Sequence, residues 1–128
     1  MPGLHNVRNA LAAAAVAVAL NVPPEAIGSG LAKFRGIPGR LTRVAAIHGA
    51  TLIDDTYNAN PDSVKAALAV LAGVPGTRLF VLGDMGELGA STVSLHEEIG
   101  RVARDARIDG LYALGAVSYT HLTLPTKA

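Results

Sequence analysis

The chain has 128 residues, about half of them apolar, and a formal net charge of +1 at pH 7. This length suffices for one domain of roughly 100 residues with a modest core and leaves no room for a second full domain. The balanced charge and the scarcity of aromatic residues argue against nucleic-acid binding. Because cysteine is absent, disulfides, thiolate zinc sites and cysteine nucleophiles are excluded, which fits a cytoplasmic location.

Two helices are expected in the N-terminal part of the chain. Residues 6–20 are rich in alanine, which has the highest intrinsic helix propensity, and its small side chains allow close packing, so a buried helix is expected there. Their apolar run is shorter than the roughly 20 residues that cross a bilayer, so no membrane span is expected. A second helix is predicted to begin at Pro24, with the first turn suited to proline. Residues 35–40 combine glycine and proline without periodicity, which indicates a linker and a domain boundary after residue 37.

Residues 41–114 alternate between predicted strands and helices. Residues 41–47 and 50–54 are expected to form a hairpin around His48-Gly49. Asn60 and Pro61 are typical of a helix start, and Gly73 ends that helix. The next predicted elements are a strand at 78–82, a helix from about residue 91 and a strand at 111–114. This order predicts an α/β fold with a truncated, Rossmann-like parallel sheet and flanking helices.

The C-terminal residues depart from this pattern. Residues 116–128 show neither helical periodicity nor a compact apolar run, although a loop and a helix are due after the last strand. They look like a translated sequencing adaptor and are expected to be a non-native tail. The predicted organisation is therefore a helical pair in residues 1–37, an incomplete Rossmann-like domain in residues 38–115, and this tail.

Polar or glycine-rich residues follow two of the predicted strands. Asp54 and Asp55 end one strand, and Gly83-Asp-Met-Gly-Glu-Leu-Gly89 follows another. Ligands bind at such strand ends in open α/β sheets, and a carboxylate there suits the two hydroxyls of a ribose. The alternative is that both aspartates cap loops, which is the commoner role of such pairs. The glycine run lacks the G-x-G-x-x-G and P-loop patterns, so by itself it is a weak nucleotide signal.

Two further residue types bear on chemistry. Arg40 lies at the predicted linker, where its guanidinium could bind a phosphate through two hydrogen bonds; a solvated surface arginine is the alternative. The four histidines lie in different predicted elements without metal-ligand spacing, so no metal ligand is predicted and each is expected to have a structural or surface role. They are His5, His48, His96 and His121.

Taken together, these motifs resemble those of the Mur ligases of peptidoglycan synthesis in both order and spacing. The resemblance covers about residues 3–115 and implies the end of a central ATPase domain followed by most of a C-terminal domain. The motifs are His5-Asn-x-x-Asn9, Pro38-Gly-Arg40, Leu52-Ile-Asp-Asp-x-Tyr-Asn-Ala-Asn-Pro61, and Gly83-Asp-Met-Gly-Glu-Leu-Gly89 with His96.

The resemblance also implies a reaction and a set of site residues. The Tyr57-Asn-Ala-Asn-Pro61 run favours the ligase that adds D-alanyl-D-alanine to UDP-N-acetylmuramoyl-tripeptide over ligases that add a single amino acid. Asn9 would contact adenine, Asp55 would hold the ribose, and Arg40 would reach the ATP phosphates as the catalytic arginine. The groups that bind magnesium and the lysine of the P-loop would lie upstream of this chain. The parent enzyme is expected to be a monomer. The residues expected to face the dipeptide are Tyr57, Asn58, Asn60, Asp84 and Met85.

Two alternatives to this reading remain. A sibling ligase that adds one amino acid would share most of the motifs. A Rossmann-like binding module without catalytic activity would share the fold but would have no need for a linker arginine or an adenine-binding asparagine. The order of the motifs favours the ligase fragment, and the fragment alone is expected to be inactive.

Overall fold

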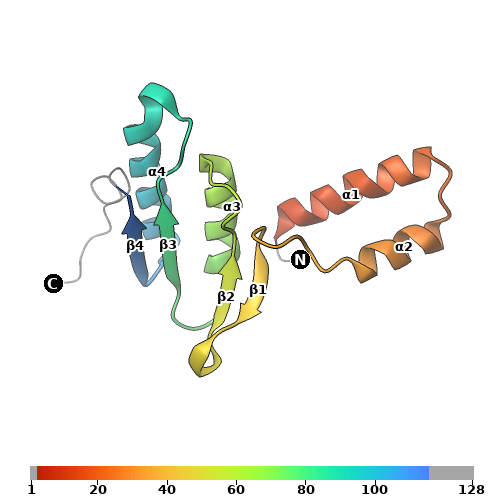
Figure 1. The fold of residues 1–128 in the computed structure, drawn as a ribbon, viewed down its shortest axis with the longest axis horizontal. Coiled ribbons are helices and arrows are strands. Elements are labelled where there is room, and N and C mark those ends of the chain that lie inside the picture. Colours follow the sequence, from red (N-terminus) through yellow and green to blue (C-terminus); the bar gives the residue numbers. More distant parts are fainter. Residues whose placement is uncertain (1–2, 116–128) are drawn as a thin grey trace. The chain divides into compact units, whose positions relative to one another are not determined.

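The computed structural model describes residues 3–115, and this part of the chain divides into two compact units between Tyr57 and Asn58 (Figure 1). The expected tail at 116–128 lies outside the described residues. Within residues 3–115, no helix is both long enough and apolar enough to cross a membrane.

The first unit begins with the predicted helical pair. Helix α1 spans Leu4–Ala19 and helix α2 spans Pro24–Lys33, and the two pack against each other (Figure 1). Pro24 occupies the first turn of α2, where its missing N–H group costs no hydrogen bond. The expectation that α1 is buried is not met, because all of its described residues are exposed or half-buried.

The predicted hairpin follows in the same unit. Strand β1 (Thr42–Ala45) pairs antiparallel with β2 (Thr51–Asp54), with Thr42 opposite Asp54. The connection is a 3₁₀ turn at Ile47–Gly49, in which both His48 and Gly49 have positive φ angles of 56° and 76°. The expected glycine turn is therefore present, with the histidine sharing the left-handed conformation.

The second unit packs two helices on a parallel strand pair. Helix α3 spans Pro61–Ala72, strand β3 spans Leu79–Gly83, helix α4 spans Thr92–Asp105 and strand β4 spans Gly110–Leu114. The strands pair in parallel register, with Val81 opposite Tyr112. The α/β class is thus confirmed, but β2 belongs to the antiparallel hairpin and not to this parallel pair.

Alternation along the strands explains why the helices cover one face of the β3–β4 pair (Figure 1). Phe80 and Leu82 point to the covered face together with Leu111 and Ala113, whereas the intervening residues are exposed. On the helix side, Leu68 and Ile99 are fully buried, and burial of such side chains stabilises a fold by about 1.5–3 kcal/mol each. The core consists of Val64, Leu68, Leu82, Met85, Ile99, Ala103 and Ile108.

Helix α3 begins at a complete capping box. The Asn60 side chain accepts a hydrogen bond from the Ser63 amide at 2.9 Å, and the Ser63 hydroxyl accepts one from the Asn60 amide at 3.0 Å. Two backbone donors of the first turn are satisfied in this way.

One ion pair joins α3 to α4. Lys65 Nζ lies 2.7 Å from Glu98 Oε1. The hydrogen bond from Lys65 lowers the pKa of the Glu98 carboxyl, and the same bond raises the pKa of Lys65. The Glu98 contribution to stability is therefore present above the carboxyl pKa of the unfolded chain and is lost as the pH falls through the lower folded-state value.

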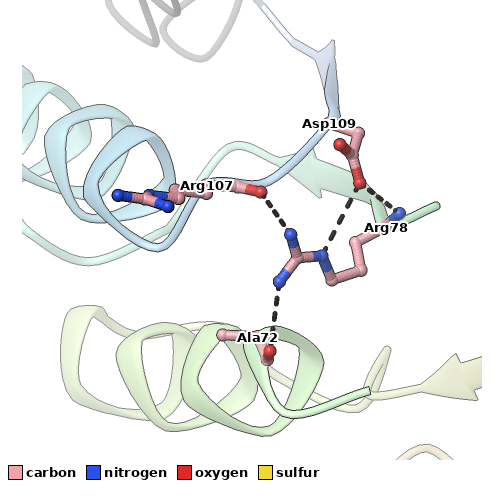
Figure 2. Close-up of polar contacts among 4 residues, drawn as sticks. All are labelled: Ala72, Arg78, Arg107 and Asp109. Carbon is pink, nitrogen blue, oxygen red and sulfur yellow. Dashed lines mark hydrogen bonds and ion pairs between the residues drawn. The ribbon is translucent and has the colours of Figure 1, made fainter. Parts of the chain in front are cut away.

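Arg78 precedes β3 and makes polar contacts near the C-terminal ends of α3 and α4 and before the start of β4. Its Nη1 donates to the carbonyl of Ala72 at 3.1 Å and its Nη2 to the carbonyl of Arg107 at 2.9 Å (Figure 2). Asp109 Oδ2 accepts a hydrogen bond from the Arg78 amide at 2.8 Å and lies at an ion-pair distance of 3.6 Å from Nε. The carbonyl of Ala72, the last residue of α3, lacks an intrahelical donor, and Arg107 lies in the turn after α4, so the guanidinium satisfies two groups that would otherwise need water.

This arrangement predicts that Arg78→Met lowers the free energy of unfolding of the second unit by about 1–3 kcal/mol, because two carbonyls and a carboxylate lose a charged donor. Amide exchange of β3 and β4 measures the effect. Arg104→Met is the matched control, since Arg104 makes only a surface contact with its neighbour Asp105 and a change below about 1 kcal/mol is expected. Equal effects of the two substitutions would contradict the bridging role of Arg78.

Candidate functional site

Two hydrogen bonds join the segment before β1 to the segment after β2. The Tyr57 amide donates to the Gly39 carbonyl at 3.0 Å. The Leu41 amide donates to Asp55 Oδ1 at 3.1 Å. These bonds extend the hairpin past its regular ladder and bring together three predicted site residues, namely Arg40, Asp55 and Tyr57.

Gly39 permits the close approach of the two segments. Its φ angle is +73°, and a Cβ atom at this position would lie 3.2 Å from the Tyr57 amide nitrogen. Leu41 also adopts a positive φ of 50° and is buried. A left-handed conformation costs a non-glycine residue free energy, so the burial of Leu41 and its bond to Asp55 offset local strain.

The Arg40 side chain projects from this join. It is exposed, and its Cζ atom lies 4.2 Å from the centroid of the Tyr57 ring. A cation at this distance from an aromatic face is attracted by the ring quadrupole. The guanidinium thus has a defined location while its N–H donors remain able to meet an anion.

The two adjacent aspartates have different partners. Asp54 Oδ1 accepts hydrogen bonds from the Thr56 amide at 3.1 Å and the Thr56 hydroxyl at 2.7 Å, which closes a local turn. Asp55 instead reaches across to Leu41. Each carboxylate therefore stabilises a loop, as the alternative interpretation of the pair expected. A carboxylate oxygen offers further lone pairs, so this role leaves room for a ligand hydroxyl at Asp55.

The second unit has its own polar strand end. Asp84 follows β3 and is exposed, and Gly115 follows β4. A Cβ atom on Gly115 would lie 2.5 Å from Asp84 Cγ, and the glycine has a φ of +105°, so the Asp84 carboxyl group occupies space that a side chain at 115 would need. Asn58 Oδ1 accepts from the Ala59 amide at 2.9 Å, while Asn60 caps α3.

Met85 is not available in the manner that the sequence suggested. Its side chain is 2% exposed and belongs to the core, because the residue after Asp84 turns back toward α4. The Met85 amide donates to Nε2 of the buried His96 at 3.0 Å, and His96 Nδ1 lies 2.7 Å from the Thr92 carbonyl. Nδ1 must therefore carry the proton, and His96 has the structural role expected for the histidines.

The remaining expectations concern adenine and metal. Asn9 lies on α1 and is exposed, and its adenine contact stays a prediction. In the described part of the chain, no three His, Cys, Asp or Glu side chains gather closely enough to hold a metal ion. Sequence analysis missed the Gly39 approach, the Leu41–Asp55 bond and the His96–Met85 bond; of these, only Gly39 had a local signal, the Pro38-Gly-Arg40 turn.

The geometry defines a class of protein, an α/β protein with polar strand ends and an exposed arginine held beside a hairpin. The family model "Mur ligase, glutamate ligase domain" matches residues 39–122. The chain therefore belongs to the Mur ligase family.

Individual relatives agree with this assignment. The chain is 44% identical over 93% of its length to the UDP-N-acetylmuramoyl-tripeptide--D-alanyl-D-alanine ligase of Escherichia coli, and it covers 26% of that protein. A crystal structure of MurF from Acinetobacter baumannii matches with a TM-score of 0.88 and 42% identity, covering 95% of this chain and 27% of the other. MurF from Thermotoga maritima in complex with ADP matches with a TM-score of 0.60 and 35% identity, over 65% and 19% of the two chains. The chain thus spans about a quarter of the length of the curated relatives that it matches.

The join between the two segments predicts different effects for two glycine substitutions. Gly39→Ala and Gly49→Ala both place alanine at a positive φ, but a Cβ at Gly49 meets no atom within 4 Å. Each should lower the free energy of unfolding of the first unit by about 1–2 kcal/mol through backbone strain. Only Gly39→Ala should also accelerate amide exchange at Tyr57. An unchanged Tyr57 amide in Gly39→Ala would contradict the close approach.

Proposed function

We propose that this chain is part of an ATP-dependent ligase that joins D-alanyl-D-alanine to UDP-N-acetylmuramoyl-tripeptide. The observation that carries the proposal is the 44% identity, over 93% of the chain, to a protein named for this reaction. The matching MurF structure in complex with ADP supports ATP as the second substrate. Residues 1–37 would end the central ATPase domain, residues 38–115 would form most of the C-terminal domain, and the enzyme would be a cytoplasmic monomer.

The proposed reaction has two steps that both build negative charge on oxygen. A carboxylate oxygen of the tripeptide attacks the γ-phosphorus of ATP, and ADP leaves. The dipeptide amine then attacks the acyl-phosphate carbon, loses a proton and expels phosphate from a tetrahedral intermediate. Positively charged donors stabilise such transition states when they are held in place before the reaction. The exposed guanidinium of Arg40 is the group of this chain suited to that role.

The remaining site roles divide between binding the nucleotide and binding the dipeptide. We assign adenine contact to Asn9 and ribose contact to Asp55, whose second function is the hydrogen bond to Leu41. The magnesium ion and the P-loop lysine would belong to parts of the enzyme outside this chain. Candidates for contact with the dipeptide are the exposed Tyr57, Asn58, Asn60 and Asp84. The Met85 side chain is buried in the core and is not a candidate.

An acceptor series separates the proposal from its alternatives. In the full-length enzyme that contains this segment, ADP release should require UDP-N-acetylmuramoyl-tripeptide and D-alanyl-D-alanine together. Release with a single amino acid in place of the dipeptide would identify a sibling ligase. An absence of ATP turnover with every acceptor would favour a binding module.

Arginine substitutions in the same enzyme test the assigned catalytic role. Arg40→Ala should lower kcat on the order of 100-fold, with a smaller change in the KM for ATP, because its main contribution is to the transition state. Arg43→Ala is the matched control, since Arg43 is also exposed and lies three residues further along, on β1. A loss confined to ATP affinity, or an equal loss in the control, would contradict the role of Arg40.

A further inference from the structure

The contact between Arg40 and Tyr57 has a function that the reaction scheme does not assign. Tyr57 is one of the more exposed large side chains, at 67%, yet its ring lies against the guanidinium, 4.2 Å from centroid to Cζ. An exposed ring with an exposed arginine is normally free to move, so their association needs a cause in the local structure.

The backbone supplies that cause. The amide of Tyr57 is bound to the carbonyl of Gly39, directly before Arg40, at 3.0 Å. The amide of Leu41, directly after Arg40, is bound to Asp55, two residues before Tyr57, at 3.1 Å. The Arg40 amide itself donates to the Ile37 carbonyl at 3.1 Å. Both side chains therefore start from fixed points that face each other, and the contact requires only a rotamer choice.

We propose that Tyr57 is a positioning residue for Arg40, a role that rests on the proposed ligase function. An arginine side chain has many rotamers, and holding it in one of them before the nucleotide arrives reduces the entropy lost in the transition state. The ring attracts the cation through its π face and takes none of the N–H groups as hydrogen-bond donors. The guanidinium is thereby restrained while its donors stay available to phosphate oxygens.

This role is an alternative to the dipeptide contact for which Tyr57 is a candidate under the proposed function, and the two roles predict different results. A substrate contact would lower the affinity for D-alanyl-D-alanine when the ring is removed. A positioning role instead depends on the aromatic face and not on the hydroxyl, so phenylalanine should substitute for tyrosine and leucine should not.

The contact can be tested on the chain itself by nuclear magnetic resonance. Ring currents from Tyr57 should shift the side-chain protons of Arg40 upfield. The shift should persist in Tyr57→Phe and disappear in Tyr57→Leu. Tyr112→Leu is the matched control, because Tyr112 is an exposed tyrosine of the other unit, at 58% exposure, and its loss should leave the Arg40 shifts unchanged. Arg40 proton shifts that stay the same in Tyr57→Leu would overturn the contact.

The consequence for catalysis is tested in the full-length ligase. Tyr57→Leu should lower kcat by about two- to fivefold, which corresponds to the strength of an exposed cation–π pair, and Tyr57→Phe should restore most of the loss. Equal kcat values in all three proteins would overturn the positioning role. So would a rise in the KM for D-alanyl-D-alanine at constant kcat, which would indicate a substrate contact. Inactivity of the unsubstituted enzyme would instead contradict the proposed function, and the resonance experiment would still decide whether the contact exists.

Discussion

The candidate site depends on the pair of hydrogen bonds that join residues 39–41 to residues 55–57. One bond uses the backbone of Gly39 and Tyr57, and the other uses the Leu41 amide and the Asp55 carboxylate. Together they fix the chain on both sides of Arg40 without using the arginine side chain. The hairpin β1–β2 that lies between the two segments keeps them in register. The backbone thus fixes the starting point of the Arg40 side chain, and the contact with the Tyr57 ring restrains the guanidinium.

In the second unit, contacts that stabilise the fold are made by residues other than the exposed polar residue that follows β3. At the start of the strands, Arg78 satisfies the carbonyl at the end of α3 and the carbonyl of Arg107 in the turn after α4, and it binds Asp109. At the other end, the buried His96 side chain accepts a hydrogen bond from the Met85 amide. This bond anchors the loop that follows β3. Asp84, one residue earlier, remains exposed. A rigid support beneath a polar strand end is the arrangement that α/β proteins use to hold ligand-binding groups in place.

Local signals in the sequence predicted most of the elements, and long-range contacts account for what they did not predict. Asn60, Pro61 and Gly73 marked the ends of α3, and His48-Gly49 marked the hairpin turn, because caps and turns depend on neighbouring residues. The absence of β2 from the parallel β3–β4 pair, the burial of Met85 and the bond from Leu41 to Asp55 depend on residues distant in sequence. The order and spacing of motifs identified the family, which is confirmed by the match over residues 39–122. The assigned domain boundaries and residue roles remain predictions.

The two hydrogen bonds that position Arg40 should form before nucleotide binds. Amide hydrogen exchange at Leu41 and Tyr57, measured in the full-length enzyme with and without a non-hydrolysable ATP analogue, tests this most directly. Because both amides donate to acceptors of the chain itself, they should already be protected in the free enzyme and change little when the analogue is added. Protection that arises only with the analogue would contradict preformed hydrogen bonds and would mean that the nucleotide itself orders these segments.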